Sequence, residues 1–209
     1  MLPVFRSACG TIVRAGIARV EGTGRKISCG PACGACCRQM VPISAAEASM
    51  IRGLVETMPD EKRSILKERF ADAVAKLDSA GLLDRFKSEP QPTGTEYREL
   101  GLEYFHLGIP CPFLEDESCS IHPDRPLVCR EYLVVSPPEN CQRSNGEPVE
   151  VVRMPLEASK ALAGLSASST WTPLTMVLDQ PETETRQTAG TKIATQFFSN
   201  LTQTNLGRG

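Results

Sequence analysis

A dense run of cysteines is the feature that most constrains this chain. Four thiols fall within the nine residues from Cys29 to Cys37, and the residues between them are glycine, alanine and proline. Small side chains let the backbone fold back on itself, so such a loop can bring several thiolates to one soft metal ion. The run therefore predicts an irregular, cysteine-lined metal centre with other elements packed around it.

A second group of cysteines lies in the second half of the chain. Seven, nine and eleven residues separate its successive members, which are Cys111, Cys119, Cys129 and Cys141. These gaps are too wide for the paired knuckles of a zinc ribbon, so we expect this group to complete a site that the first group begins. The candidate metal ligands are Cys29, Cys33, Cys36, Cys37, Cys111, Cys119, Cys129 and Cys141.

Thiolates are soft, charged ligands that suit zinc and iron equally, so the cysteines do not choose between these metals. The neighbouring side chains of Cys36 and Cys37 diverge, which makes them an awkward pair on one tetrahedral ion. One of them is free to face a second metal or an iron-sulfur cluster. Cys9 lies outside both groups and is expected to pack as a small hydrophobic residue.

Several other residues near the cysteines have two interpretations each. His106 and His122 are either nitrogen ligands or ordinary hydrogen-bonded histidines. Three arginines, Arg38, Arg125 and Arg130, stand beside cysteines in the sequence. They either offset the charge of gathered thiolates or are solvated on the surface.

The bulk composition limits the domain organisation and the partners. A chain of 209 residues with 41% apolar content suits one domain, and we expect it at 1–165 with a C-terminal helical extension at 166–209. The net charge of -2 gives no electrostatic footprint for nucleic acid, and no apolar run is long enough for a membrane span. An odd number of cysteines with two adjacent suits thiolate ligands and indicates a reducing, cytoplasmic location.

Hydrophobic periodicity predicts a mainly α fold with one short β-hairpin. An N-terminal helix should stop at Glu21–Gly24, and a capping box of Ser44 and Glu47 should start the next helix. The other predicted helices are 60–81, 96–107, 156–165 and 191–201, and the hairpin strands are 131–135 and 148–154.

Taken together, these motifs resemble a known family. The chain reads Cys-x3-Cys-Gly-x-Cys-Cys-Arg, then Cys-Pro-Phe-Leu, then Cys-Ser-Ile-His-x2-Arg-Pro-x2-Cys-Arg-Glu-Tyr. It is similar to the CxxCxxCC family of bacterial cysteine-cluster proteins, described as zinc- or iron-chelating domains, over roughly Ser28 to Cys141. The resemblance places the family's Arg-Pro element at Arg125-Pro126 and its cysteines at Cys29, Cys33, Cys36, Cys37, Cys111, Cys119 and Cys129. One extra residue between Cys29 and Cys33 departs from the family's nominal pattern.

The resemblance indicates what the protein binds, a metal, more clearly than which reaction it catalyses. We expect a metal-binding protein, and two alternatives stay open. One branch of relatives is similar to flagellin lysine methylases, which implies an iron-sulfur-dependent methyltransferase-like enzyme. A metal-trafficking protein that binds its metal exchangeably is the other. The spacing of Cys29, Cys33 and Cys36 also matches a radical S-adenosylmethionine motif, but the strand and helix repeats of that barrel are missing.

Overall fold

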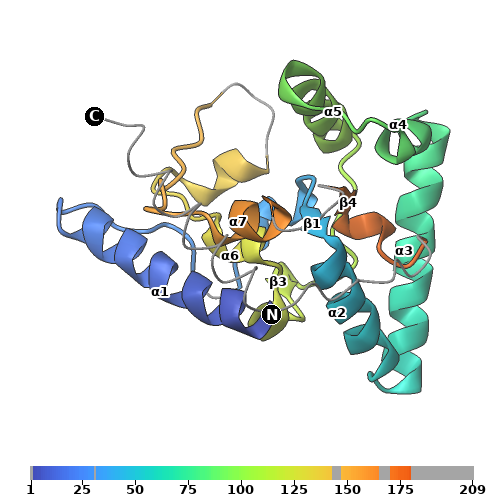
Figure 1. The fold of residues 1–209 in the computed structure, drawn as a ribbon, viewed down its shortest axis with the longest axis horizontal. Helices are drawn as coiled ribbons and strands as arrows, with labels where there is room; N and C mark the ends of the chain where they lie inside the picture. The colour runs from blue at the N-terminus through green and yellow to red at the C-terminus, as the bar shows by residue number, and fades with distance from the viewer. Residues whose placement is uncertain (1, 31, 143–146, 165–169, 180–209) are drawn as a thin grey trace.

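The computed structural model describes residues 2–30, 32–142, 147–164 and 170–179, and the fold in these ranges is mainly α-helical (Figure 1). The α-helices are α1 (Leu2–Glu21), α2 (Ala45–Glu56), α3 (Asp60–Ser79), α4 (Leu83–Lys87), α5 (Gly94–His106), α6 (Leu127–Glu131) and α7 (Ala158–Gly164). The short 3-10 helices are η1 (Ala35–Arg38), η2 (His122–Asp124), η3 (Pro138–Cys141) and η4 (Leu174–Met176). The predicted fold class is confirmed.

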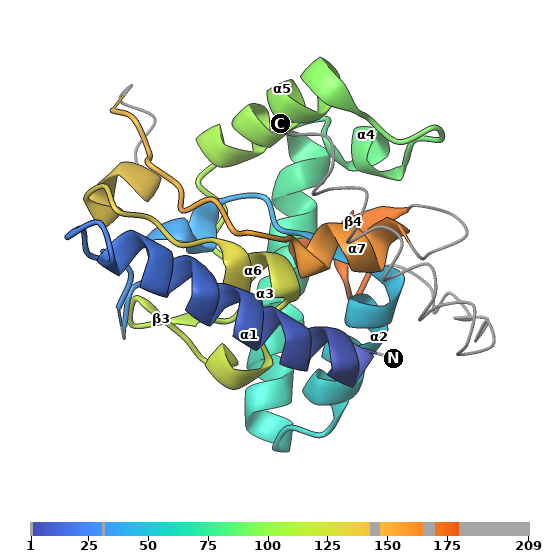
Figure 2. The ribbon, with the colours of Figure 1, turned by 60° about the vertical axis from the view of Figure 1, so that its left-hand side comes forward.

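Helix α1 lies across α6 and α7, as Figure 2 shows. Phe5 and Cys9 on its inner face pack with Leu127, Ala158 and Leu162 in one apolar cluster. The helix ends at Glu21 and the following turn closes through Gly24, which has a φ of 80° that favours glycine. The predicted N-terminal helix is therefore confirmed.

Helices α2 and α3 form an antiparallel pair at one side of the molecule (Figure 1). The predicted capping box is present: the Ser44 hydroxyl accepts from Glu47 N, and the Glu47 carboxylate accepts from Ser44 N. Between the helices, Phe70 meets Phe113 edge to face, with ring centroids 5.4 Å apart. This contact joins the helix pair to the segment that carries the second cysteine motif.

Two small antiparallel sheets complete the fold in the described residues. Strand β1 (Pro42–Ser44) pairs with β4 (Trp171–Pro173), with Ile43 opposite Thr172. Strands β2 (Leu114–Glu115) and β3 (Ser118–Cys119) form a tight hairpin. Because β4 pairs with β1, part of the chain beyond residue 165 belongs to the same packed unit.

The hairpin predicted from 131–135 and 148–154 is not formed as two strands. Glu131 is the last residue of α6, and the two segments share a single antiparallel bridge between Val134 and Val151. The backbone hydrogen bonds from Val135 N to Glu150 O and from Val152 N to Leu133 O flank that bridge. The prediction that these two segments pair is thus correct. The predicted strands are too long, and the segments do not form the predicted hairpin.

The remaining helix predictions have mixed outcomes. Helices α3, α5 and α7 confirm the predictions for 60–81, 96–107 and 156–165 within a few residues. Helices α4 and α6, five residues each, were not predicted. The predicted helix at 191–201 lies outside the described residues. None of the helices in the described ranges is long and apolar enough to cross a membrane.

Two buried carboxylates hold the short helix α6 in place. Glu47 accepts a hydrogen bond from Leu127 N at 2.8 Å, which ties the start of α2 to the start of α6. Glu131 accepts from the backbone of Ala158 and Ser159 at the start of α7. Carboxylates stabilise unpaired N–H groups at helix N-termini, so both contacts fix the orientation of the helix that carries Cys129.

Candidate metal centre

The first cysteine motif is placed by η1 and the loop before it. Cys36 and Cys37 lie on η1, and Cys29 and Cys33 lie in the preceding loop. Gly34 is required there by a close approach: a Cβ on it would lie 2.5 Å from Leu114 Cδ1 and 2.7 Å from the Glu117 carbonyl oxygen. The motif's glycine thus brings Cys36 and Cys37 close to the β2–β3 hairpin.

The second motif meets the first through the backbone. Cys111 N donates to the Cys37 carbonyl oxygen at 2.6 Å, and Leu114 N donates to Cys111 O at 2.8 Å. Cys119 ends β3 and Cys129 lies in α6. Main-chain contacts therefore join residues that are far apart in the sequence.

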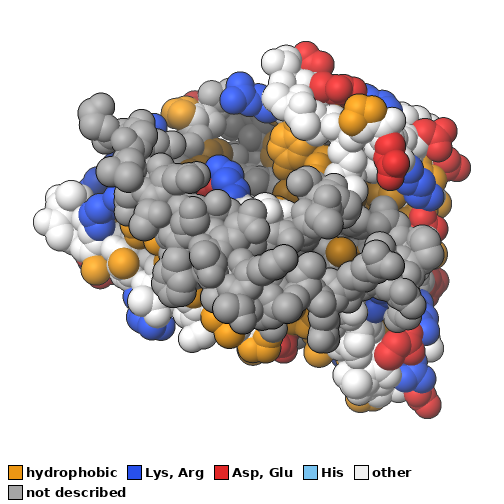
Figure 3. Space-filling view, viewed as in Figure 1, with side chains coloured by type: hydrophobic (Ala, Val, Ile, Leu, Met, Phe, Trp, Pro, Cys, Tyr) orange, Lys and Arg blue, Asp and Glu red, His pale blue; other side chains and the backbone are white. Residues whose placement is uncertain are grey.

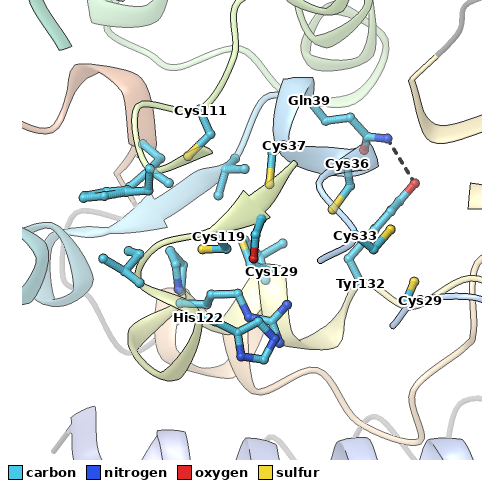
Figure 4. Close-up of a pocket in the computed structure, with 18 of the residues that line it drawn as sticks. Cys29, Cys33, Cys36, Cys37, Gln39, Cys111, Cys119, His122, Cys129 and Tyr132 are labelled. Carbon is cyan, nitrogen blue, oxygen red and sulfur yellow. Dashed lines mark hydrogen bonds between the residues drawn. The ribbon is translucent and has the colours of Figure 1, made fainter. Parts of the chain in front are cut away.

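A cavity of about 110 Å³ lies where the two motifs meet (Figure 4). Figure 4 shows the cysteines of the first motif along one side of the cavity and those of the second along the other. No aspartate or glutamate is among the described residues that line it. The lining cysteines are Cys29, Cys33, Cys36, Cys37, Cys111, Cys119 and Cys129.

The donor set of this cavity fits a soft metal. Thiolate sulfur is the preferred ligand of zinc and of iron-sulfur clusters, and the described lining contains no carboxylate that would favour a hard cation. Within the described ranges, no three His, Cys, Asp or Glu side chains are already grouped as ligands of one ion. The fit therefore rests on the chemistry and number of the thiols that share the cavity.

Four of the thiols that line the cavity have raised pKa values, which favours their neutral form. Burial raises the pKa of Cys111, Cys119 and Cys129. The pKa of Cys36 is raised chiefly by its hydrogen bond with Cys37, and burial adds to that. Because a metal binds the thiolate and not the thiol, binding at this cavity must release protons.

Cys141, the eighth candidate ligand, lies outside this cavity. It is buried in η3 beside Ala35 and Val134, and burial raises its pKa to about 11. Its thiol is hydrogen-bonded to the Tyr132 hydroxyl, and Gln39 Nε2 donates both to that hydroxyl and to Cys141 O, each at 3.3 Å. Figure 4 shows Gln39 and Tyr132 at the cavity with the hydrogen bond between them, and their contacts with Cys141 link that residue to the cavity.

Cys141 instead borders a second, open groove of about 720 Å³ beside α5, visible as a hollow bordered by hydrophobic side chains in Figure 3. His106 lines this groove and not the cysteine cavity. His122 does line the cavity, and burial together with the charges of Arg125 and Arg130 lowers its pKa. Of the two histidines, His122 is thus the one beside the thiols.

Sequence reasoning missed two residues of this site. Gln39 and Tyr132 connect the cavity to Cys141, yet neither belongs to a spacing pattern that would single it out. Gln39 reaches Cys141 because η1 contacts η3, which joins segments about 100 residues apart, and Tyr132 directly follows α6. The Tyr in the Cys-Arg-Glu-Tyr motif was the only signal available in the sequence.

A comparison with known families bears on this geometry. The family model CxxCxxCC, described as "Putative zinc- or iron-chelating domain", matches residues 28–149, more than half of the chain. The match contains both cysteine motifs and η3 with Cys141. Neither a curated protein nor a solved structure matches the chain.

Proposed function

Because the chain belongs to the CxxCxxCC family of zinc- or iron-chelating domains, we propose that it binds its metal in one centre shared by the two cysteine motifs. One observation carries the proposal: seven of the nine cysteines, drawn from both motifs, line a single cavity. If the motifs formed two separate sites, each motif would instead surround a cavity of its own. The metal would be held by thiolates among Cys29, Cys33, Cys36, Cys37, Cys111, Cys119 and Cys129.

The number of thiols argues for a centre larger than one closed zinc ion. A structural zinc site usually takes four ligands, and this cavity offers seven thiols. The surplus suits a second ion or an iron-sulfur cluster, both of which use more sulfur donors in one place. When bound, the metal supplies Lewis-acid or redox chemistry, and the protein's residues shield it within a largely apolar pocket.

Purification without oxygen, followed by metal and acid-labile sulfide analysis, tests the proposal. Brown protein with iron and sulfide would identify a cluster and favour the methyltransferase-like alternative. Colourless protein with tightly held zinc would identify a structural site, and zinc that exchanges readily with a chelator would favour trafficking. Protein that takes up neither metal at stoichiometric amounts would refute the proposal.

Serine variants test whether the centre is shared. We expect Cys33→Ser and Cys129→Ser each to remove the same bound metal, because a hydroxyl oxygen is a poor substitute for thiolate at a soft metal. The double variant should lose no more than either single variant. Loss of half the metal in each single variant, with complete loss only in the double, would show two separate sites. Cys9→Ser, outside the cavity, is the matched control.

A further inference from the structure

Three arginines flank the cysteines in the sequence, and two of them are already engaged elsewhere. Arg38 forms a two-pronged ion pair with Glu117, with Nη1–Oε2 at 3.0 Å and Nη2–Oε1 at 2.6 Å. Arg130 donates from Nε to the Arg125 carbonyl oxygen at 2.9 Å and from Nη2 to the Pro123 carbonyl oxygen. Neither of these two arginines is among the described residues that line the cavity.

Arg125 is different because it lines the cysteine cavity without a counter-charge. Its Nε atom is buried and has no hydrogen-bond partner within the described part of the chain. No carboxylate of the described residues forms an ion pair with it, and none lines the cavity. A buried donor without a hydrogen-bond partner is costly, so the unpaired Nε of this half-buried arginine calls for an explanation.

The positive charge of Arg125 reaches thiols of both motifs. Arg125 lines the same cavity as Cys29 of the first motif and Cys119 and Cys129 of the second. Cys36 of the first motif lines that cavity too. The thiols are thus the groups whose negative charge would be paired with this guanidinium.

A metal surrounded by thiolates has an excess of negative charge. One divalent zinc with four thiolates carries a net charge of about -2. In this protein it would lie in a desolvated and largely apolar cavity. A cation beside it, with no carboxylate partner among the described residues, lowers the cost of burying that charge.

We propose that Arg125 is the counter-ion of the metal centre, so that the group bound in this cavity is an anionic metal–thiolate assembly and not a neutral one. The inference rests on the proposed metal binding. It assigns Arg125 a positioning and charge-balancing role and does not make it a metal ligand. Arg38 and Arg130 have structural roles at the rim of the site.

Zinc affinity in Arg125 variants tests the proposal. We expect Arg125→Gln to weaken zinc binding by about 10- to 100-fold, the range typical of lost partners outside the ligand shell. Arg125→Lys, which keeps the charge, should recover a large part of that loss. The measurement is competition with a chromophoric chelator in purified protein, with the absorption of the cobalt-substituted form as a second readout. If the protein binds an iron-sulfur cluster, Arg125→Gln should also make its reduction potential more negative.

Two controls separate the counter-ion role from a structural one. Arg25→Gln removes an equal charge from an exposed ion pair with Glu150 and should leave zinc affinity unchanged. The metal-free Arg125→Gln protein should keep its circular dichroism spectrum. Equal zinc affinity in Arg125→Gln and wild type would overturn the proposal, as would a Lys variant as weak as the Gln variant. Wild-type protein that binds no metal would overturn the proposed function itself and with it this inference.

Discussion

The close contact at Gly34 gives the most direct test of how the two motifs are joined. Replacing Gly34 with alanine adds a Cβ 2.5 Å from Leu114 Cδ1 and 2.7 Å from the Glu117 carbonyl oxygen. Optimal separations between such heavy atoms are about 3.5–4.0 Å, so the added atom is roughly 1 Å too close. Leu114 can rotate away, but the Glu117 carbonyl is backbone and must move with its turn.

The turn that contains Glu117 has little freedom to move. Asp116 and Glu117 both have left-handed backbone conformations, with φ of 47° and 57°, and the Arg38 ion pair fixes Glu117 against η1. Overpacking of this kind costs about 1–3 kcal/mol. For a protein of this size, we therefore expect Gly34→Ala to lower the melting temperature by about 2–12 °C.

The assay is thermal and urea unfolding of the metal-free protein, followed by zinc affinity of the variant. Gly30→Ala is the matched control, because a Cβ on Gly30 has no neighbour within 4 Å. Since the added Cβ pushes η1 away from the hairpin, Gly34→Ala should also weaken zinc binding, whereas Gly30→Ala should not. If the two variants unfold at the same temperature as the wild type, the close approach of the motifs is refuted.

Two further predictions concern residues away from the cavity. Cys9 has 0% exposure and packs with Phe5 and Leu127, so Cys9→Ser should leave the metal content unchanged but lower the free energy of unfolding by about 1–3 kcal/mol, measured in urea. An unchanged unfolding midpoint would contradict the buried position. Burial raises the pKa of Glu131 above its usual 4.5, so its contribution to stability is present at pH below 4.5 and is lost as the pH rises through the folded-state pKa. Glu131→Gln should flatten that pH dependence in urea unfolding curves recorded between about pH 4 and 7; a slope equal to that of the wild type would count against it.

The sequence predicted the elements whose signals are local. The capping box of Ser44 and Glu47 lies within four residues, and the long helices α1 and α3 repeat their apolar positions over several turns. Helices α4 and α6 have five residues each, too few for a periodic pattern to appear. The sheet of β1 and β4 joins three-residue strands about 130 residues apart, so only tertiary packing specifies it.

The same division applies to the site. Clustered thiols are visible in the sequence, and the wide spacing of the second group led us to expect that it completes a site begun by the first. Three of its four cysteines line the same cavity as the first group. The separate place of Cys141, behind Tyr132, follows from the packing of η3 against η1 and has no counterpart in the spacing. Nor could the sequence distinguish Arg125 from Arg38 and Arg130, because the difference lies in which partners the fold supplies.

The way in which the motifs are joined explains why this cavity can keep several neutral thiols together before any metal arrives. The hydrogen bond from Cys111 N to Cys37 O and the packing of Gly34 on the hairpin use only backbone and apolar contacts. Buried carboxylates position α6 from outside the cavity, so they are not among its possible ligands, although the charge of Glu47 adds to the rise in the pKa of Cys129. Metal binding here would replace thiol protons, and part of its cost would be that of deprotonation in a desolvated pocket. A fixed positive charge lowers that cost without occupying a ligand position. This is the role that we propose for Arg125.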